Sequence, residues 1–130
     1  MLSRKDLRPF SQQSTAEKFD PTGLWINELG STMTIEEYDG TNFFGSYTSL
    51  VSADGKTVSG RVSGTIAGDS IAFTVNWKAD FSSVTAWSGI VMGSEEGSAI
   101  YTLWHLSSTP ESDDDVWQSI KAGSDLFVRE

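Results

Sequence analysis

From Gly23 onward the chain alternates apolar and polar residues in short runs separated by turn residues. A period of two, with many Val, Ile, Thr, Phe, Tyr and Trp residues, is typical of strands with one buried face. The pattern predicts eight strands, at about 23–28, 31–38, 43–50, 57–66, 70–78, 84–92, 98–106 and 124–129. Turn signals at DGTN, ADGK, AGD, GSEEG and SSTPESDDD separate them. DVWQSI, before the last strand, is a candidate for one turn of helix.

These strands predict an all-β fold, an eight-stranded antiparallel up-and-down β-barrel. The connections are too short for parallel crossovers, so sequential neighbours should pair antiparallel. Closing the sheet into a barrel removes its exposed edges. We expect residues 22–130 to form this one domain, and the polar residues 1–21 to be a flexible tail or a cloning remnant.

Side-chain alternation also predicts which residues point into the barrel. The expected interior set is Trp25, Asn27, Ser31, Met33, Ile35, Phe43, Tyr47, Ser49, Ile71, Phe73, Val75, Trp77, Thr85, Trp87, Ile100, Thr102, Trp104 and Leu106. In an up-and-down barrel the ends of odd strands and the starts of even strands meet at one rim. That rim collects the polar residues Asn27, Ser31, Tyr47, Ser49 and Thr85, three of the tryptophans, and Asp125.

This gathering at one rim is the main functional signal. An unsatisfied buried polar group costs about 1–3 kcal/mol, so a packed core would avoid so many of them. A single inward Ser or Thr is often bonded to backbone, but aromatic walls combined with several placed polar groups are typical of a small-molecule site. An eight-stranded barrel has room for one small ligand. The pattern therefore predicts a ligand pocket at this mouth.

Composition and charge argue against several other classes of function. A formal charge of −9 and a pI near 4.4 argue against nucleic acid and anionic membranes as partners. The sequence has no cysteine and one histidine, His105, which lies on an outward face. It offers no nucleophile with an adjacent base and no metal-ligand cluster, so we expect neither an enzyme nor a metal site. No apolar run is long enough for a membrane span, and no signal peptide is visible.

Several segments together resemble the avidin and streptavidin family of biotin-binding proteins. They are TGLWINELGST, GSYTS, SGR, FTVNWK, SSVTAWSG, YTLWHL and VWQSIKAGSDLF, and the resemblance runs from Thr22 to Arg129. It implies a streptavidin-like barrel that binds biotin tightly without a cofactor. It also implies secretion and assembly into a homotetramer. The loop from Val51 to Lys56 resembles a lid over the ligand.

The resemblance further implies roles for individual residues. Asn27, Ser31 and Tyr47 resemble the donors to the ureido oxygen of biotin, and Ser49 and Asp125 the acceptors of its two N–H groups. Further contacts are implied as follows: Thr85 with the thioether sulfur; Ser83 and Ala53 near the carboxylate; Trp77, Trp87 and Trp104 as walls; Leu29 and Val51 as apolar lining; Trp117 lent to a neighbouring subunit. His105 and Ala122 stand where the family has larger apolar residues at a subunit interface.

Two other functions stay open at this point. GLW at 23–25 also resembles the G-x-W start of lipocalins, which would make the protein a carrier of another small ligand. That function predicts an apolar lining, whereas Asn27, Ser31, Tyr47 and Asp125 favour a polar head group. A barrel that binds proteins through its outer loops is the third possibility.

Overall fold

The computed structural model describes residues 8–9, 19–50, 57–77, 82–94, 97–109 and 120–130. In these ranges the chain forms nine strands, which are β1 (Arg8–Pro9), β2 (Gly23–Asn27), β3 (Thr32–Tyr38), β4 (Asn42–Ser49), β5 (Val58–Ala67), β6 (Ser70–Trp77), β7 (Ser83–Ser94), β8 (Gly97–Ser108) and β9 (Ile120–Arg129). No helix within the described ranges is long and apolar enough to span a membrane.

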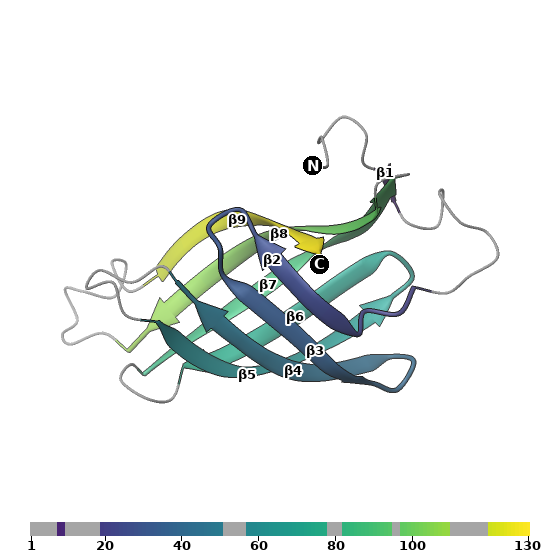
Figure 1. The fold of residues 1–130 in the computed structure, drawn as a ribbon. Helices are drawn as coiled ribbons and strands as arrows, with labels where there is room; N and C mark the ends of the chain where they lie inside the picture. Colours follow the sequence, from purple (N-terminus) through teal and green to yellow (C-terminus); the bar gives the residue numbers. More distant parts are fainter. Residues whose placement is uncertain (1–7, 10–18, 51–56, 78–81, 95–96, 110–119) are drawn as a thin grey trace.

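Strands β2 to β9 form a closed antiparallel barrel (Figure 1). Each strand pairs with the next in sequence, and β9 returns to pair with β2, so that the barrel has no open seam. This confirms the predicted eight-stranded up-and-down barrel. The two-residue β1 lies in the segment expected to be a tail and pairs with β7 at Met92 and Gly93.

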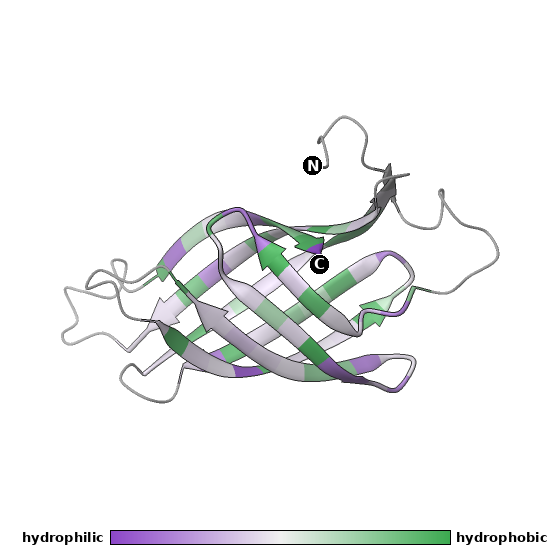
Figure 2. Ribbon diagram, in the orientation of Figure 1, coloured by the Kyte–Doolittle hydropathy of each residue, from purple (hydrophilic) through white to green (hydrophobic). Residues whose placement is uncertain are grey.

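The barrel interior follows the predicted alternation. Figure 2 shows hydrophobic and hydrophilic residues alternating along the strands, as expected when one face is buried. The buried apolar core includes Trp25, Met33, Ile35, Phe43, Tyr47, Val62, Ile71, Phe73, Val75, Trp77, Trp87, Val91, Ile100 and Phe127. Full burial of one such side chain contributes about 1.5–3 kcal/mol, so this core is the main source of stability.

The end of the barrel where β2 begins is closed by packing around Trp25. Its indole Nε1 donates a 2.9 Å hydrogen bond to the carbonyl oxygen of Pro21, and its ring lies 6.0 Å from that of Phe19. The guanidinium of Arg129 lies 4.5 Å from the Trp25 ring centroid, a cation–π distance. The packed chain thus includes Phe19 and Pro21, ahead of the domain start expected at residue 22. Two apolar residues in a polar stretch have no periodicity that could reveal this.

The last strand differs from the prediction at its start. It was expected to begin at about residue 124, but β9 begins at Ile120. Gly123 lies inside this strand, at a position where a Cβ would come within 2.5 Å of the Trp104 ring. Glycine serves close packing here and not a turn. Of the predicted helical turn DVWQSI, Ile120 is in β9 and residues 115–119 lie outside the described residues.

Candidate ligand-binding cavity

A cavity of about 400 Å³ occupies the end of the barrel where β2, β4, β6 and β8 end and β3, β5, β7 and β9 begin. This volume is in the range of small-molecule sites. It is lined by Asn27, Leu29, Ser31, Tyr47, Ser49, Val58, Trp77, Ser83, Thr85, Trp87, Trp104, Leu106, Ser108 and Asp125.

The structure brings most of the predicted site residues to this cavity. Val51, Ala53 and Trp117 are the exceptions, since they lie outside the described residues, and the rest of the set lines the cavity. Three lining residues, Val58, Leu106 and Ser108, were not predicted as site residues. Leu106 was expected inside the barrel, and the alternation of β5 could have placed Val58 there too. Ser108 was missed because β8 extends two residues beyond its predicted end.

Asn27 ends β2 and organises the turn into β3. Its Oδ1 accepts hydrogen bonds from the backbone N–H groups of Leu29 at 3.0 Å and Ser31 at 2.9 Å. Gly30 completes the turn at φ +85°, a conformation that favours glycine. Because the amide oxygen is used by the turn, the Nδ2 group is the part of Asn27 that is available to the cavity, and it can only donate. It lies 3.4 Å from the Tyr47 hydroxyl.

Ser31 and Tyr47 extend this row of donors. The Ser31 Oγ accepts a 3.1 Å hydrogen bond from the backbone N–H of Leu50, so its proton points elsewhere, and the Tyr47 hydroxyl is within hydrogen-bond reach. Burial, and then the negative charge of Asp125, raise the pKa of Tyr47 well above its ordinary value. The phenol therefore stays protonated at any physiological pH and can act as a donor.

The apolar walls of the cavity are aromatic rings in mutual contact. The ring of Tyr47 lies 5.7 Å from that of Trp77, edge to face, and 5.0 Å from that of Trp87. Trp87 in turn stacks on Phe73 with ring centroids 4.9 Å apart, and this contact holds the Trp87 ring in place. The Trp77 indole donates a 2.9 Å hydrogen bond to the Thr85 Oγ1, so the hydroxyl proton of Thr85 is also directed elsewhere.

Asp125 is the one acidic side chain among the lining residues, and it is 6% exposed. Its Oδ2 accepts a 2.9 Å hydrogen bond from the Trp87 indole, and its backbone carbonyl accepts one from Thr102. Burial raises the pKa of this carboxyl to about 6, against the lowering effect of the Trp87 hydrogen bond. The Glu28 carboxylate raises this pKa further, and the Asn27 amide lowers it.

The hydrogen-bond polarity of the cavity follows from these contacts. The Asn27 Nδ2, the Ser31 hydroxyl and the Tyr47 hydroxyl form a cluster of donors, while Asp125 supplies an acceptor beside it. Within the described residues, every buried side-chain nitrogen or oxygen has a hydrogen-bond partner. The inward polar groups are therefore stabilised by the fold itself and still present a defined polarity to a guest.

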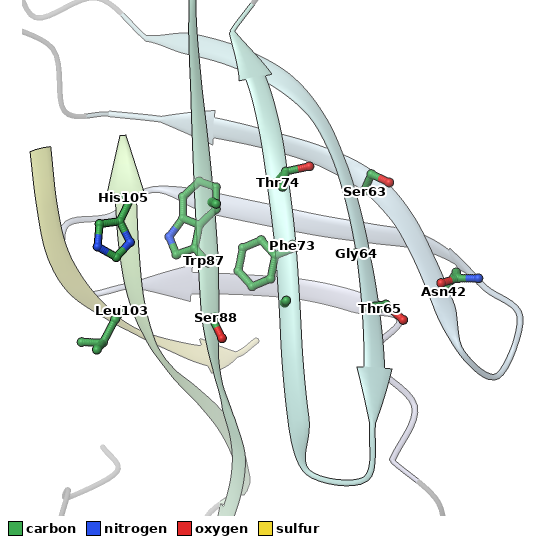
Figure 3. Close-up of a pocket in the computed structure, with 12 residues that line it drawn as sticks. Asn42, Ser63, Gly64, Thr65, Phe73, Thr74, Trp87, Ser88, Leu103 and His105 are labelled. Atoms are coloured by element: carbon green, nitrogen blue, oxygen red, sulfur yellow. The ribbon is translucent and has the colours of Figure 1, made fainter. Parts of the chain in front are cut away.

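A second hollow, of about 640 Å³, lies on the outside of the barrel across β5 to β8 (Figure 3). The outward side chains on β6 and β7 that line the hollow, among them Ala72, Ala86 and Ser88, are small, and this makes the surface concave. Leu103 and His105 of β8 stand at one side of it. His105, expected on an outward face, is exposed between Ala86 and Ala122 of the neighbouring strands.

The fold and the cavity define a ligand-holding β-barrel with a polar head-group site and aromatic walls. The sequence model of the Avidin family matches residues 15–130, and the chain belongs to this family. Avidin from Gallus gallus is 32% identical over 130 residues, which span 88% of this chain and 81% of that protein.

Solved structures give the same result. The crystal structure of xenavidin superimposes with a TM-score of 0.77 at 29% identity, covering 88% of this chain and all of that one. A structure described as a biotin-binding protein from chicken superimposes with a TM-score of 0.71 at 32% identity, covering 84% of this chain and 96% of the other.

Among the described residues, no group of three or more His, Cys, Asp or Glu side chains could hold a metal ion.

Proposed function

We propose that this protein binds biotin in the barrel cavity with high affinity and does not transform it. The observation that carries the proposal is the polarity of the cavity, where three side-chain donors stand beside a buried carboxylate between indole rings. A cyclic urea has the complementary polarity, with one carbonyl oxygen and two N–H groups. Family membership and the chicken biotin-binding protein support the same ligand.

The proposed contacts assign a role to each part of the ligand. Asn27, Ser31 and Tyr47 donate to the ureido oxygen, while Ser49 and Asp125 accept its two N–H groups. Thr85 faces the thioether sulfur and Ser83 the valerate carboxylate, beside which the family resemblance puts Ala53. The walls are Trp77, Trp87 and Trp104, with Leu29 and Val51 as apolar lining. Because β4, β6 and β9 hold Tyr47, Trp77 and Asp125 in place before the ligand arrives, little ordering cost for these groups opposes binding.

Thermal unfolding with and without biotin tests the proposal. A ligand present at about a thousand times its Kd stabilises the folded state by about 4 kcal/mol, so we expect the melting temperature to rise by about 10 °C or more. A long-chain fatty acid, the ligand type expected of a lipocalin-like carrier, should leave it unchanged. A melting temperature that does not move at saturating biotin would refute the proposal.

Replacement of Asp125 tests the site itself. Asp125→Ala should weaken biotin binding by at least about 1.5 kcal/mol, because a hydrogen bond to a charged acceptor is lost. Isothermal titration calorimetry measures the difference. Glu37→Ala removes a carboxylate from the exposed face of β3, at the other end of the barrel, and is the matched control. Unchanged affinity in the Asp125 variant would rule out its role as acceptor.

The proposed assembly is a homotetramer in which Trp117 completes a neighbour's pocket. The outer face of β7 and β8 supports contact with a second copy, since it exposes Val84, Ile90 and Leu103 beside the concave surface of the outer hollow. Replacing Trp117 with Ala should speed biotin release, and an unaltered off-rate would count against exchange between subunits. Light scattering gives the assembly state. Secretion, implied by the family resemblance, belongs to the same proposal.

A further inference from the structure

Glu28 lies in the turn between β2 and β3 and does not line the cavity. Its Oε2 accepts a 2.8 Å hydrogen bond from the backbone N–H of Leu126 in β9. Leu126 directly follows Asp125, so this bond holds Glu28 against the same segment of β9, where its carboxylate is close enough to interact with that of Asp125 by charge and by hydrogen bond. Although Glu28 is exposed, it is held in place by a backbone donor.

Within the part of the chain that the structure describes, one charged side chain acts on Asp125. The indole of Trp87 approaches it from β7 and the amide of Asn27 from the end of β2. Tyr47 of β4 lies near enough to experience its charge, and the Thr102 hydroxyl of β8 bonds to its backbone carbonyl. Tyr47 stays protonated, so of these neighbours the charge that acts on Asp125 is that of the Glu28 carboxylate.

Two adjacent carboxyl groups favour a shared proton. An ionised Asp125 is repelled by the Glu28 carboxylate, while a protonated Asp125 can donate a hydrogen bond to it. Both effects add to the burial that already favours the neutral form. The turn residue therefore shifts Asp125 toward protonation, in opposition to Trp87 and Asn27.

We propose that Glu28 couples biotin capture to pH, by stabilising the protonated form of Asp125 and so weakening the hold on the ureido group in mild acid. This inference rests on the proposed function, in which a ureido N–H is donated to the Asp125 carboxylate. Glu28 is a positioning residue, because it acts on the ligand only through Asp125.

The coupling has a defined direction and size. The ionised carboxylate accepts the N–H far more strongly than the neutral carboxyl does, so ligand binding favours ionised Asp125 and releases its proton to solvent wherever the free site holds one. With a pKa of about 6, the ionised fraction falls about tenfold between pH 7 and pH 5. Affinity should fall by the same factor over that interval and should level off above pH 7.

The test compares dissociation constants at pH 7 and pH 5 for the wild type and Glu28→Gln, measured by titration calorimetry with biotin methyl ester. The ester removes the ligand's own titrating carboxyl. The side-chain amide of the variant keeps an oxygen to accept the Leu126 N–H but carries no charge, and its NH2 group can donate to ionised Asp125. We expect a loss of about tenfold for the wild type and of less than about threefold for Glu28→Gln.

Two controls make the result specific. Glu37→Gln removes the same charge at the far end of β3 and should keep the tenfold loss of the wild type. In the wild type itself, the binding enthalpy at pH 5 should vary with the ionisation enthalpy of the buffer, which reports the released proton without any variant.

The outcomes separate the two proposals. A wild-type protein that binds tightly with equal affinity at both pH values, or a Glu28→Gln variant with the same tenfold loss, overturns the role of Glu28 and leaves biotin binding intact. If the wild type binds biotin methyl ester at neither pH, both the role of Glu28 and the proposed biotin binding are overturned.

Discussion

The indole N–H of Trp87 in β7 donates a 2.9 Å hydrogen bond to the carboxylate of Asp125 in β9, although β8 lies between these strands. The bond crosses the barrel interior. One residue thus serves both as an aromatic wall of the cavity and as the group that orients the acceptor. It also opposes the burial that favours a neutral Asp125.

Trp87→Phe should separate these two roles. The ring remains but the donor is lost, so the pKa of Asp125 should rise and the pH at which biotin affinity declines should move upward. At pH 7 we expect affinity to fall by at least about 1.5 kcal/mol, the lower range for a hydrogen bond to a charged group. Calorimetric titrations from pH 5 to 8 measure both effects. Trp104→Phe shortens another wall without touching this bond, and it should weaken binding without moving the pH profile.

The raised pKa of Asp125 also predicts how the free protein responds to pH. Its folded-state value of about 6 lies above the ordinary 3.8, so the neutral form favours folding and this stability is lost as pH rises through 6. Asp125→Asn should therefore stabilise the ligand-free protein by about 1–3 kcal/mol at pH 7.5 and by little at pH 4. Urea unfolding at the two pH values measures the difference, and an equal gain at both would contradict it. The same variant should bind biotin poorly.

Much of this molecule could be predicted from residue order alone. Alternation with turn signals predicted the eight strands of the barrel, its closure and most of the interior set, because each strand has one face on the core and a one-residue slip would expose it. The two-residue β1 was not predicted. The polar residues were predicted to converge at one mouth because the ends of the odd-numbered predicted strands and the starts of the even-numbered ones meet at the same rim. Family resemblance added the proposed ligand and the proposed roles of individual residues, which remain predictions.

The parts that were not predicted depend on contacts between segments distant in sequence. The turn formed by Asn27 uses the amide oxygen that alternation alone leaves free for a ligand. The bond from Leu126 to Glu28 joins residues 98 apart, and no local pattern encodes it. The early start of β9 was missed because the residue against which Gly123 packs, Trp104, lies on another strand.

Gly123→Ala tests the close packing of this glycine against Trp104. A Cβ at this position would lie 2.5 Å from the Trp104 ring, so the indole must move away from β9. We expect a loss of about 1–3 kcal/mol of stability from this overpacking, and weaker biotin binding because Trp104 lines the cavity. Chemical unfolding and calorimetry measure the two losses. Ser124→Ala, at the exposed neighbouring position, should change stability by no more than about 0.5 kcal/mol. A Gly123 variant as stable as the wild type would show that the ring has room to shift.

Asn27 and Tyr47 should differ in what their removal costs, although both are proposed donors to the same ligand oxygen. Asn27→Ala deletes two hydrogen bonds of the β2–β3 turn together with the donor, so it should lower stability by about 1–3 kcal/mol and also weaken binding. Tyr47→Phe keeps the ring that packs against Trp77 and Trp87, and the hydroxyl it removes makes a long 3.4 Å contact with Asn27 and lies within reach of the Ser31 hydroxyl. It should therefore lower biotin affinity by about 1 kcal/mol or more while leaving the unfolding midpoint of the free protein nearly unchanged. Urea unfolding without ligand, followed by calorimetric titration, gives both quantities for each variant. If Tyr47→Phe destabilised the free barrel as much as Asn27→Ala, the hydroxyl would be part of the fold's own bonding and not a group held ready for a guest.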